Sequence, residues 1–139
     1  MHFVFGGAFN GKRRWVMNVY NNDTLTWISA YEQPSFPKEI YGEGVVVLEG
    51  IETWVSELIH NGFSIDEAVA FFEQQLSNWQ KQCSRLVLLG TEIGKGIVPM
   101  DEEDRKWRDA CGYVYQMIVR KAERVDQIWY GISTRLKGE

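Results

Sequence analysis

A glycine-rich segment near the start of the chain carries the residues with the clearest chemical purpose. Residues 6–13 read Gly-Gly-Ala-Phe-Asn-Gly-Lys-Arg and satisfy the spacing G-x-x-x-x-G-K. The apolar residues 2–5 before them predict a strand, and residues 12–20 predict a helix. In that context the glycines let backbone N–H groups turn toward phosphates, and Lys12 supplies positive charge at the terminal phosphates. The predicted nucleotide-binding residues are Gly6, Gly7, Ala8, Phe9, Asn10, Gly11, Lys12 and Arg13. The alternative is a plain strand-to-helix turn with a solvated Lys12.

The last position of this pattern departs from a magnesium-dependent site. Ser or Thr normally stands there and supplies a hydroxyl ligand, whereas this chain has Arg13. A guanidinium cannot ligate a cation and repels one when it faces inward. Arg13 therefore argues against bound Mg²⁺, even where nucleotide binding is kept.

A carboxylate at the end of a neighbouring strand is the second part of such a site. Glu49 directly follows the apolar run 45–48, whereas Glu52 falls on the helix that comes next. We therefore expect Lys12 and Glu49 to be the catalytic candidates, with Glu49 as the candidate metal ligand. The alternative for Glu49 is a strand-end residue that caps a helix or faces water.

Strands and helices alternate along the rest of the chain. The runs 45–48 and 86–89 are apolar at every position, which is typical of central parallel strands covered on both faces. The expected strands cover residues 2–5, 25–29, 45–48, 86–89 and 128–132, and the expected helices cover residues 12–20, 51–59, 65–79 and the segment after Asp101. This order predicts a three-layer α/β domain with a mainly parallel sheet, the architecture of P-loop NTPases.

Composition limits the class of protein. A chain of 139 residues with 45% hydrophobic residues predicts one domain over residues 1–139 with a real core. A formal charge of -4 gives no broad attraction to nucleic acid, so no nucleic-acid partner is expected. The apolar runs are too short to cross a bilayer and no signal peptide is recognised, so we expect a cytoplasmic protein without membrane contact. Cys83 and Cys111 are far apart, which favours reduced thiols.

Several segments resemble one family, the bifunctional adenosylcobinamide kinase and adenosylcobinamide-phosphate guanylyltransferase of cobalamin biosynthesis. The strongest is residues 91–99, Thr-Glu-Ile-Gly-Lys-Gly-Ile-Val-Pro, which is similar to the family's N-E-V-G-x-G-I-V-P. Residues 6–12 are similar to G-G-A-x-x-G-K, residues 47–50 to L-L-E-C, and residues 126–129 to D-x-V-W. The helix pattern R-x-x-R-D-x-x-G-x-x-N-Q is matched, with Tyr115 in place of Asn, by Arg105, Arg108, Asp109, Gly112 and Gln116.

The resemblance implies ATP or GTP as nucleotide, a corrinoid alcohol as phosphoryl acceptor, and a homo-oligomer. The family's guanylylated histidine lies between the second strand and the Glu49 strand, where this chain has a short loop, residues 31–44, without histidine. Guanylyl transfer by that route is therefore expected to be absent, because His2 and His60 stand elsewhere.

Two functions remain open from the sequence. One is a nucleotide-binding relative that still transfers a phosphoryl group to a corrinoid alcohol, and the other is a structural or regulatory relative that binds nucleotide weakly or not at all. The glycines of the loop 91–99 either shape a ligand-facing turn or allow a tight connection and subunit packing. Glu92 is the one residue of this loop that we select as a candidate for ligand contact.

Overall fold

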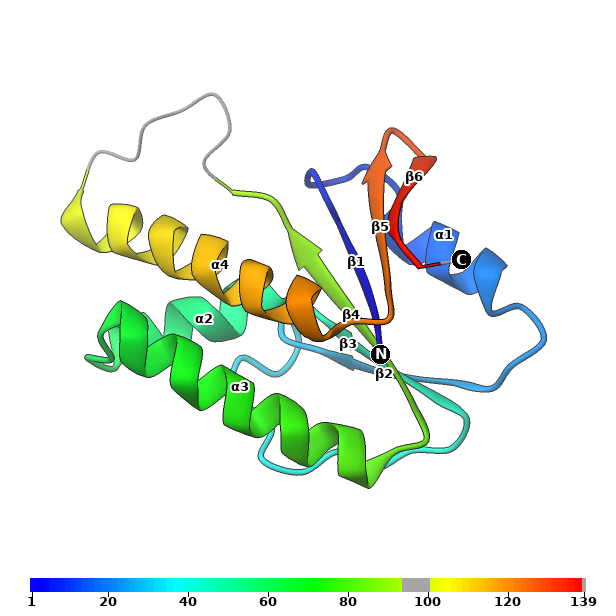
Figure 1. The fold of residues 1–139 in the computed structure, drawn as a ribbon, viewed down its shortest axis with the longest axis horizontal. Coiled ribbons are helices and arrows are strands. Elements are labelled where there is room, and N and C mark those ends of the chain that lie inside the picture. Colours follow the sequence, from blue (N-terminus) through cyan, green and yellow to red (C-terminus); the bar gives the residue numbers. More distant parts are fainter. Residues whose placement is uncertain (94–100, 139) are drawn as a thin grey trace.

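The described residues form an α/β fold around one twisted sheet. The computed structural model describes residues 1–93 and 101–138 (Figure 1). The strands are β1 (His2–Gly6), β2 (Leu25–Ser29), β3 (Val45–Glu49), β4 (Arg85–Thr91), β5 (Arg124–Trp129) and β6 (Ile132–Lys137). The helices are α1 (Lys12–Val19), α2 (Ile51–His60), α3 (Ile65–Gln82) and α4 (Glu102–Lys121).

The sheet has the strand order β2-β3-β4-β1-β5-β6. The first five strands in this order are parallel, and β6 returns antiparallel to β5. Phe5 of β1 is paired with Gly90 of β4 and with Gln127 of β5, so β1 lies at the centre. Loops that follow parallel strands meet at one edge of the sheet, which places the loop after β1 beside the ends of β3 and β4.

The predicted last strand, residues 128–132, is wrong. These residues contain the end of β5, a two-residue turn at Tyr130 and Gly131, and the first residue of β6. The two turn residues have positive φ angles of 48° and 78°. Asn or Asp before Gly is the usual signal for such a turn, and Tyr130 does not give it.

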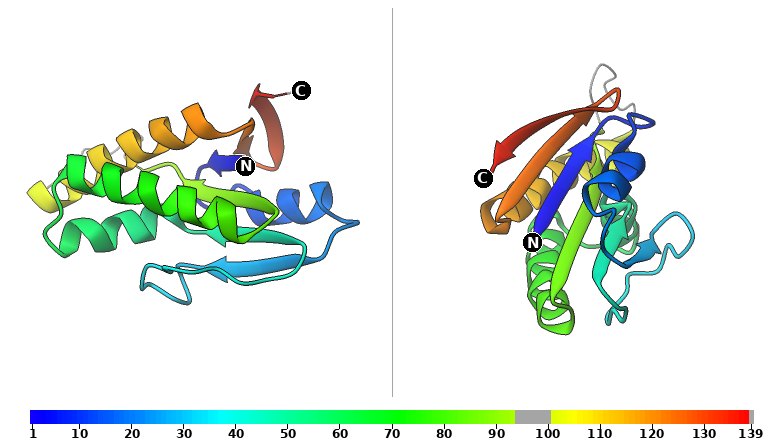
Figure 2. Two further views of the ribbon diagram at one scale, coloured as in Figure 1. Left: turned by 60° about the horizontal axis from the view of Figure 1, so that its bottom comes forward. Right: turned by 90° about the vertical axis from the view of Figure 1, so that its right-hand side faces the viewer.

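Helices cover both faces of the sheet unequally, which confirms the three-layer prediction. On one face, α1 covers a core that includes Val4, Val16 and Val47. On the other face, α2, α3 and α4 enclose a larger core around Trp54 and Trp79, both fully buried. Figure 2 shows α1 on one side of β1 and α4 on the other. The two apolar faces explain why β3 and β4 are apolar at successive positions.

Side-chain caps and glycine turns determine where the four described helices begin. Ser64 and Glu67 form a capping box at the start of α3, and the Asp101 side chain accepts a hydrogen bond from the Asp104 N–H at the start of α4. Gly11 and Gly50 precede α1 and α2 with φ angles of 88° and 90°, which glycine adopts without strain. Both tight turns bring a helix N-terminus to the carboxyl edge of the sheet.

Two further predictions can be compared with the described residues. Cys83 and Cys111 are free thiols, as expected, and Cys111 is buried. None of the helices described in residues 1–93 and 101–138 has the length and hydropathy that a membrane span requires.

Candidate nucleotide site

The glycine-rich loop, residues 6–13, joins β1 to α1 and folds around its own lysine. The ammonium group of Lys12 donates hydrogen bonds to the carbonyl oxygens of Gly7, at 2.9 Å, and Gly6, at 3.4 Å. Burial lowers the pKa of Lys12, and Glu52 and Glu49 oppose this change. The Lys12 ammonium group, which the sequence places at the terminal phosphates, is thus held at the loop. It stands at the start of a helix of two turns that has no side-chain cap, and such a helix start favours an anion.

Gly6 is required by its neighbour in the sheet. A Cβ atom at this position would lie 2.1 Å from the carbonyl oxygen of Ile128 in β5. The first glycine of the loop is therefore needed for strand packing, whatever it contributes to a ligand.

A cleft of about 790 Å³ opens beside this loop. Its walls come from the loop and first turn of α1, the ends of β3 and β4, the start of α2, and Tyr31 and Trp107. Its lining combines charged groups with apolar side chains, including Leu89 and Ile93. A concave site that combines apolar walls with a few polar groups is typical of small-molecule binding.

Arg13 and Glu49 form an ion pair within this cleft. Arg13 Nε and Nη2 donate to the two carboxylate oxygens of Glu49 at 3.1 and 2.8 Å. The guanidinium also lies 4.9 Å from the centre of the Trp27 ring. The Arg13 side chain is 52% exposed and that of Glu49 is 13% exposed. The carboxylate that the sequence selects as metal ligand is thus engaged by the residue that replaces the usual hydroxyl.

This pair does not fit a magnesium site. A divalent cation at Glu49 would have to displace a bidentate guanidinium, the strongest geometry for an arginine–carboxylate pair. Within the part of the chain that the structure describes, no group of three or more His, Cys, Asp and Glu side chains is arranged to hold a metal ion.

Glu52 is the site residue that the sequence reasoning passed over. It is only 5% exposed, although it lines the cleft. Its Oε1 accepts a hydrogen bond from the Thr91 N–H at 2.9 Å, and its Oε2 accepts one from the Tyr31 hydroxyl. Burial, followed by this bond to Glu52, raises the pKa of Tyr31. The sequence signal for Glu52 is its place in the first turn of α2, directly after the glycine turn at Gly50.

Glu92 does not line the cleft, although its charge acts on Lys12 and opposes the effect of burial on the pKa of that lysine. Its N–H donates to the Gly6 carbonyl at 2.8 Å, and its Oε1 accepts from Gln127 at 3.0 Å. It lines a separate hollow of about 420 Å³ next to Phe5 and Tyr115. Most of the predicted ligand loop, residues 94–99, lies outside the described residues, so its role stays a prediction.

Neither histidine belongs to the cleft lining. His2 is buried, with Nε2 2.6 Å from Asp126 Oδ2 and Nδ1 2.7 Å from the Tyr20 hydroxyl. His60 is exposed and lies 3.2 Å from Glu103. His2 is thus held inside the fold by two hydrogen bonds, and His60 lies at the surface.

Comparison with known proteins assigns the chain to a family. A family described as cobinamide kinase / cobinamide phosphate guanyltransferase matches residues 24–136. The chain belongs to this family. The match starts after β1, the glycine-rich loop and α1, so the case for the loop depends on its own sequence and geometry.

One curated relative illustrates the relationship in sequence. The bifunctional adenosylcobalamin biosynthesis protein CobP of Pseudomonas aeruginosa is 38% identical over 55 residues. The matched segment covers 40% of this chain and 32% of CobP, so the chain spans about a third of the length of that relative.

Proposed function

We propose that this chain binds a nucleoside triphosphate, ATP or GTP, with its phosphates in the glycine-rich loop. The observation that carries the proposal is the geometry of the loop between β1 and α1. The Lys12 ammonium group is hydrogen-bonded to this loop, and a cleft opens beside it. Helix N-termini and inward N–H groups bind phosphate in this arrangement.

We also propose that the Arg13–Glu49 pair takes the place of the usual metal ligands. The guanidinium supplies positive charge beside the phosphates, but it does not orient attacking and leaving groups as a metal ion does. Nucleotide binding should therefore depend little on magnesium, and phosphoryl transfer should be negligible.

A working kinase is the second candidate, because one observation favours it. The cleft beyond Lys12 has room and apolar walls for a large acceptor alcohol, and Glu52 is a buried carboxylate within it. Membership of the family suggests a corrinoid alcohol as this acceptor. Phosphorylation of cobinamide by the wild type, measured with ATP and with GTP, separates this candidate from a protein that only binds.

A homo-oligomer is part of the proposal. The edge strand β6 is exposed along its whole length, which leaves backbone groups available for pairing with another chain. Light scattering coupled to size-exclusion chromatography measures the mass in solution, and a monomer at high concentration would contradict this part.

The test of nucleotide binding is the variant Lys12→Ala, titrated calorimetrically with ATP and GTP. We expect it to bind at least tenfold more weakly than the wild type, equivalent to about 1.4 kcal/mol. Lys81→Ala, at the end of α3, is the matched control and should bind as the wild type does. Equal affinities of the wild type and Lys12→Ala would remove the loop from the proposal.

Guanylyl transfer through a histidine is not part of the proposed function. After incubation with GTP, intact-mass spectrometry should show no acid-labile GMP adduct, because His2 is buried and His60 lies outside the cleft lining. GMP attached to either histidine would contradict this expectation.

A further inference from the structure

Two aromatic residues, one within the glycine-rich loop and one beside it, have a backbone conformation that residues with side chains rarely adopt. Among the described residues other than glycine, Phe9 and Tyr130 are the two with positive φ, at 60° and 48°. Their exposed fractions are 103% and 82%, so packing in the core does not explain them. Left-handed backbone at a bulky residue has a free-energy cost, and such outliers concentrate at functional sites.

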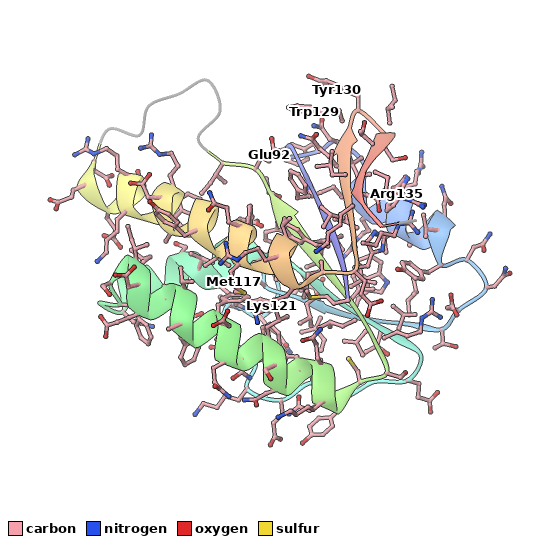
Figure 3. All side chains as sticks on the ribbon, viewed as in Figure 1. Glu92, Met117, Lys121, Trp129, Tyr130 and Arg135 are labelled. Atoms are coloured by element: carbon pink, nitrogen blue, oxygen red, sulfur yellow. The ribbon has the colours of Figure 1, made fainter. Side chains whose placement is uncertain are left out.

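Tyr130 stands at the tip of the β5–β6 hairpin, where another residue would suit the turn better. Both turn residues have positive φ, a geometry that favours Asn or Asp followed by Gly. Trp129 precedes it, and the two ring centres are 6.1 Å apart with the planes inclined by 32°. Trp129 is 37% exposed. Figure 3 shows both side chains at the hairpin tip, next to the end of β1.

The hairpin tip is attached to the glycine-rich loop itself. The N–H of Gly131 donates to the carbonyl oxygen of Asn10 at 2.7 Å. A Cβ atom built on Gly7 would be 3.5 Å from the Trp129 ring. Figure 1 shows the loop after β1 beside this tip. A ligand that fills the loop therefore has the aromatic tip as its neighbour on this side.

The position of Lys12 in the cleft indicates how a triphosphate would lie in the loop. Glu52, Glu49 and Glu92 all raise the pKa of Lys12 against the effect of burial; Glu49 and Glu52 line the cleft with Lys12, whereas Glu92 does not. With Lys12 at the terminal phosphates, that end of the ligand faces the cleft. We place the nucleoside end at the hairpin tip, because the tip is bonded to the loop at Asn10 and residues 129–131 do not line the cleft.

We propose that Tyr130, with Trp129 beside it, is the stacking platform for the base of the bound nucleotide. This inference rests on the proposed function, since it assigns the base-binding part of the same site. Stacking on aromatic rings accepts any base, because every base has a π-face. The platform therefore supports ATP and GTP alike and contributes affinity without selecting between them.

Comparison of ATP with inorganic triphosphate isolates this contribution. Both ligands occupy the phosphate loop, and only ATP reaches the hairpin tip. We expect Tyr130→Asn to weaken ATP binding at least about fivefold, the lower end of measured stacking effects, with the affinity for inorganic triphosphate unchanged. Asn suits the left-handed position, so the melting temperature should stay the same or rise.

Two further variants make the result specific. Tyr41→Asn changes a tyrosine that is 75% exposed in the segment before β3 and should leave both affinities unchanged. Phe9→Asn changes an aromatic residue that lines the cleft. In this variant the affinity for ATP divided by the affinity for inorganic triphosphate should be the same as in the wild type.

The outcomes separate this inference from the function beneath it. If the wild type binds neither ATP nor inorganic triphosphate, the proposed function fails and the platform with it. If the wild type binds both and Tyr130→Asn keeps the full difference between them, the platform alone is overturned. If Phe9→Asn loses the difference between the affinities for ATP and inorganic triphosphate while Tyr130→Asn keeps it, the base binds in the cleft, and this result also overturns the inference.

Discussion

Near the two ends of β1 lie two pairs of polar side chains that differ in burial. At the amino end, His2 pairs with Asp126, and the two side chains are 6% and 2% exposed. At the carboxyl end, Arg13 pairs with Glu49, and these are 52% and 13% exposed. Removal of one partner from a buried pair leaves an uncompensated group, whereas an exposed pair can be opened at little cost. The first pair therefore holds the fold, and the second can be rearranged by a ligand.

Loss of Asp126 should have the largest effect on stability. Asp126→Ala leaves His2 without its carboxylate and removes the acceptor of the Arg124 Nε–H, 2.8 Å away. We expect the free energy of unfolding in urea to fall by about 1–3 kcal/mol, because a buried imidazole loses its hydrogen-bond partner. Asp23→Ala is the matched control, because Asp23 pairs with Arg85 at the surface, and it should cost about 0–1 kcal/mol. Equal losses in the two variants would break the comparison between buried and exposed pairs.

Acid should weaken the same pair. Burial lowers the pKa of His2 below its usual value, against the opposing effect of the hydrogen bond to Asp126; Arg124 and Tyr20 also face the ring. The unfolded chain then binds more protons than the folded chain below pH 6.5, the usual pKa of histidine. The free energy of unfolding should therefore fall as the pH drops through this value toward the folded pKa.

Urea unfolding at pH 7.5 and 5.5 measures this dependence. His2→Gln should flatten it, and His60→Gln, at an exposed position, should leave it as in the wild type. A pH dependence that survives in His2→Gln would assign it to other groups.

Buried strands and the glycine-rich loop could be predicted because their signals are local. The runs at β3 and β4 are apolar at successive positions, and Gly11 and Lys12 stand between an apolar strand and a helix. The β5–β6 hairpin could not be predicted, because Tyr130 occupies a turn position usually held by Asn or Asp. The strand β6 also lacks a buried side, so its pattern gives no hydrophobic signal.

The site was only partly predictable, because its pairs are distant in the chain. Arg13 and Glu49 are 36 residues apart and meet through the strand order β3-β4-β1. The Glu52 carboxylate accepts a hydrogen bond from the N–H of Thr91, which lies 39 residues further along the chain. Position on the helix after β3 made Glu52 the weaker candidate in the sequence, yet the Gly50 turn brings it into the cleft.

Replacement of Arg13 should have the smallest effect on the fold. Arg13→Ser breaks a half-exposed pair and should change the free energy of unfolding by about 0–1 kcal/mol. A loss comparable to that of Asp126→Ala would show that the pair is part of the structural framework. The variant restores the hydroxyl that the loop pattern normally carries and removes the competing charge. It is therefore suited to a test of metal binding without loss of the fold.

The most direct test of the central claim is a calorimetric titration of ATP with and without magnesium. We expect the wild type to bind with nearly the same affinity in both conditions, because Arg13 and Glu49 are paired at the metal position. Magnesium should strengthen binding more in Arg13→Ser than in the wild type, and adding Glu49→Ala should cancel that gain. Strong magnesium dependence of the wild type would contradict the claim, because it would mean that the metal is held despite Arg13.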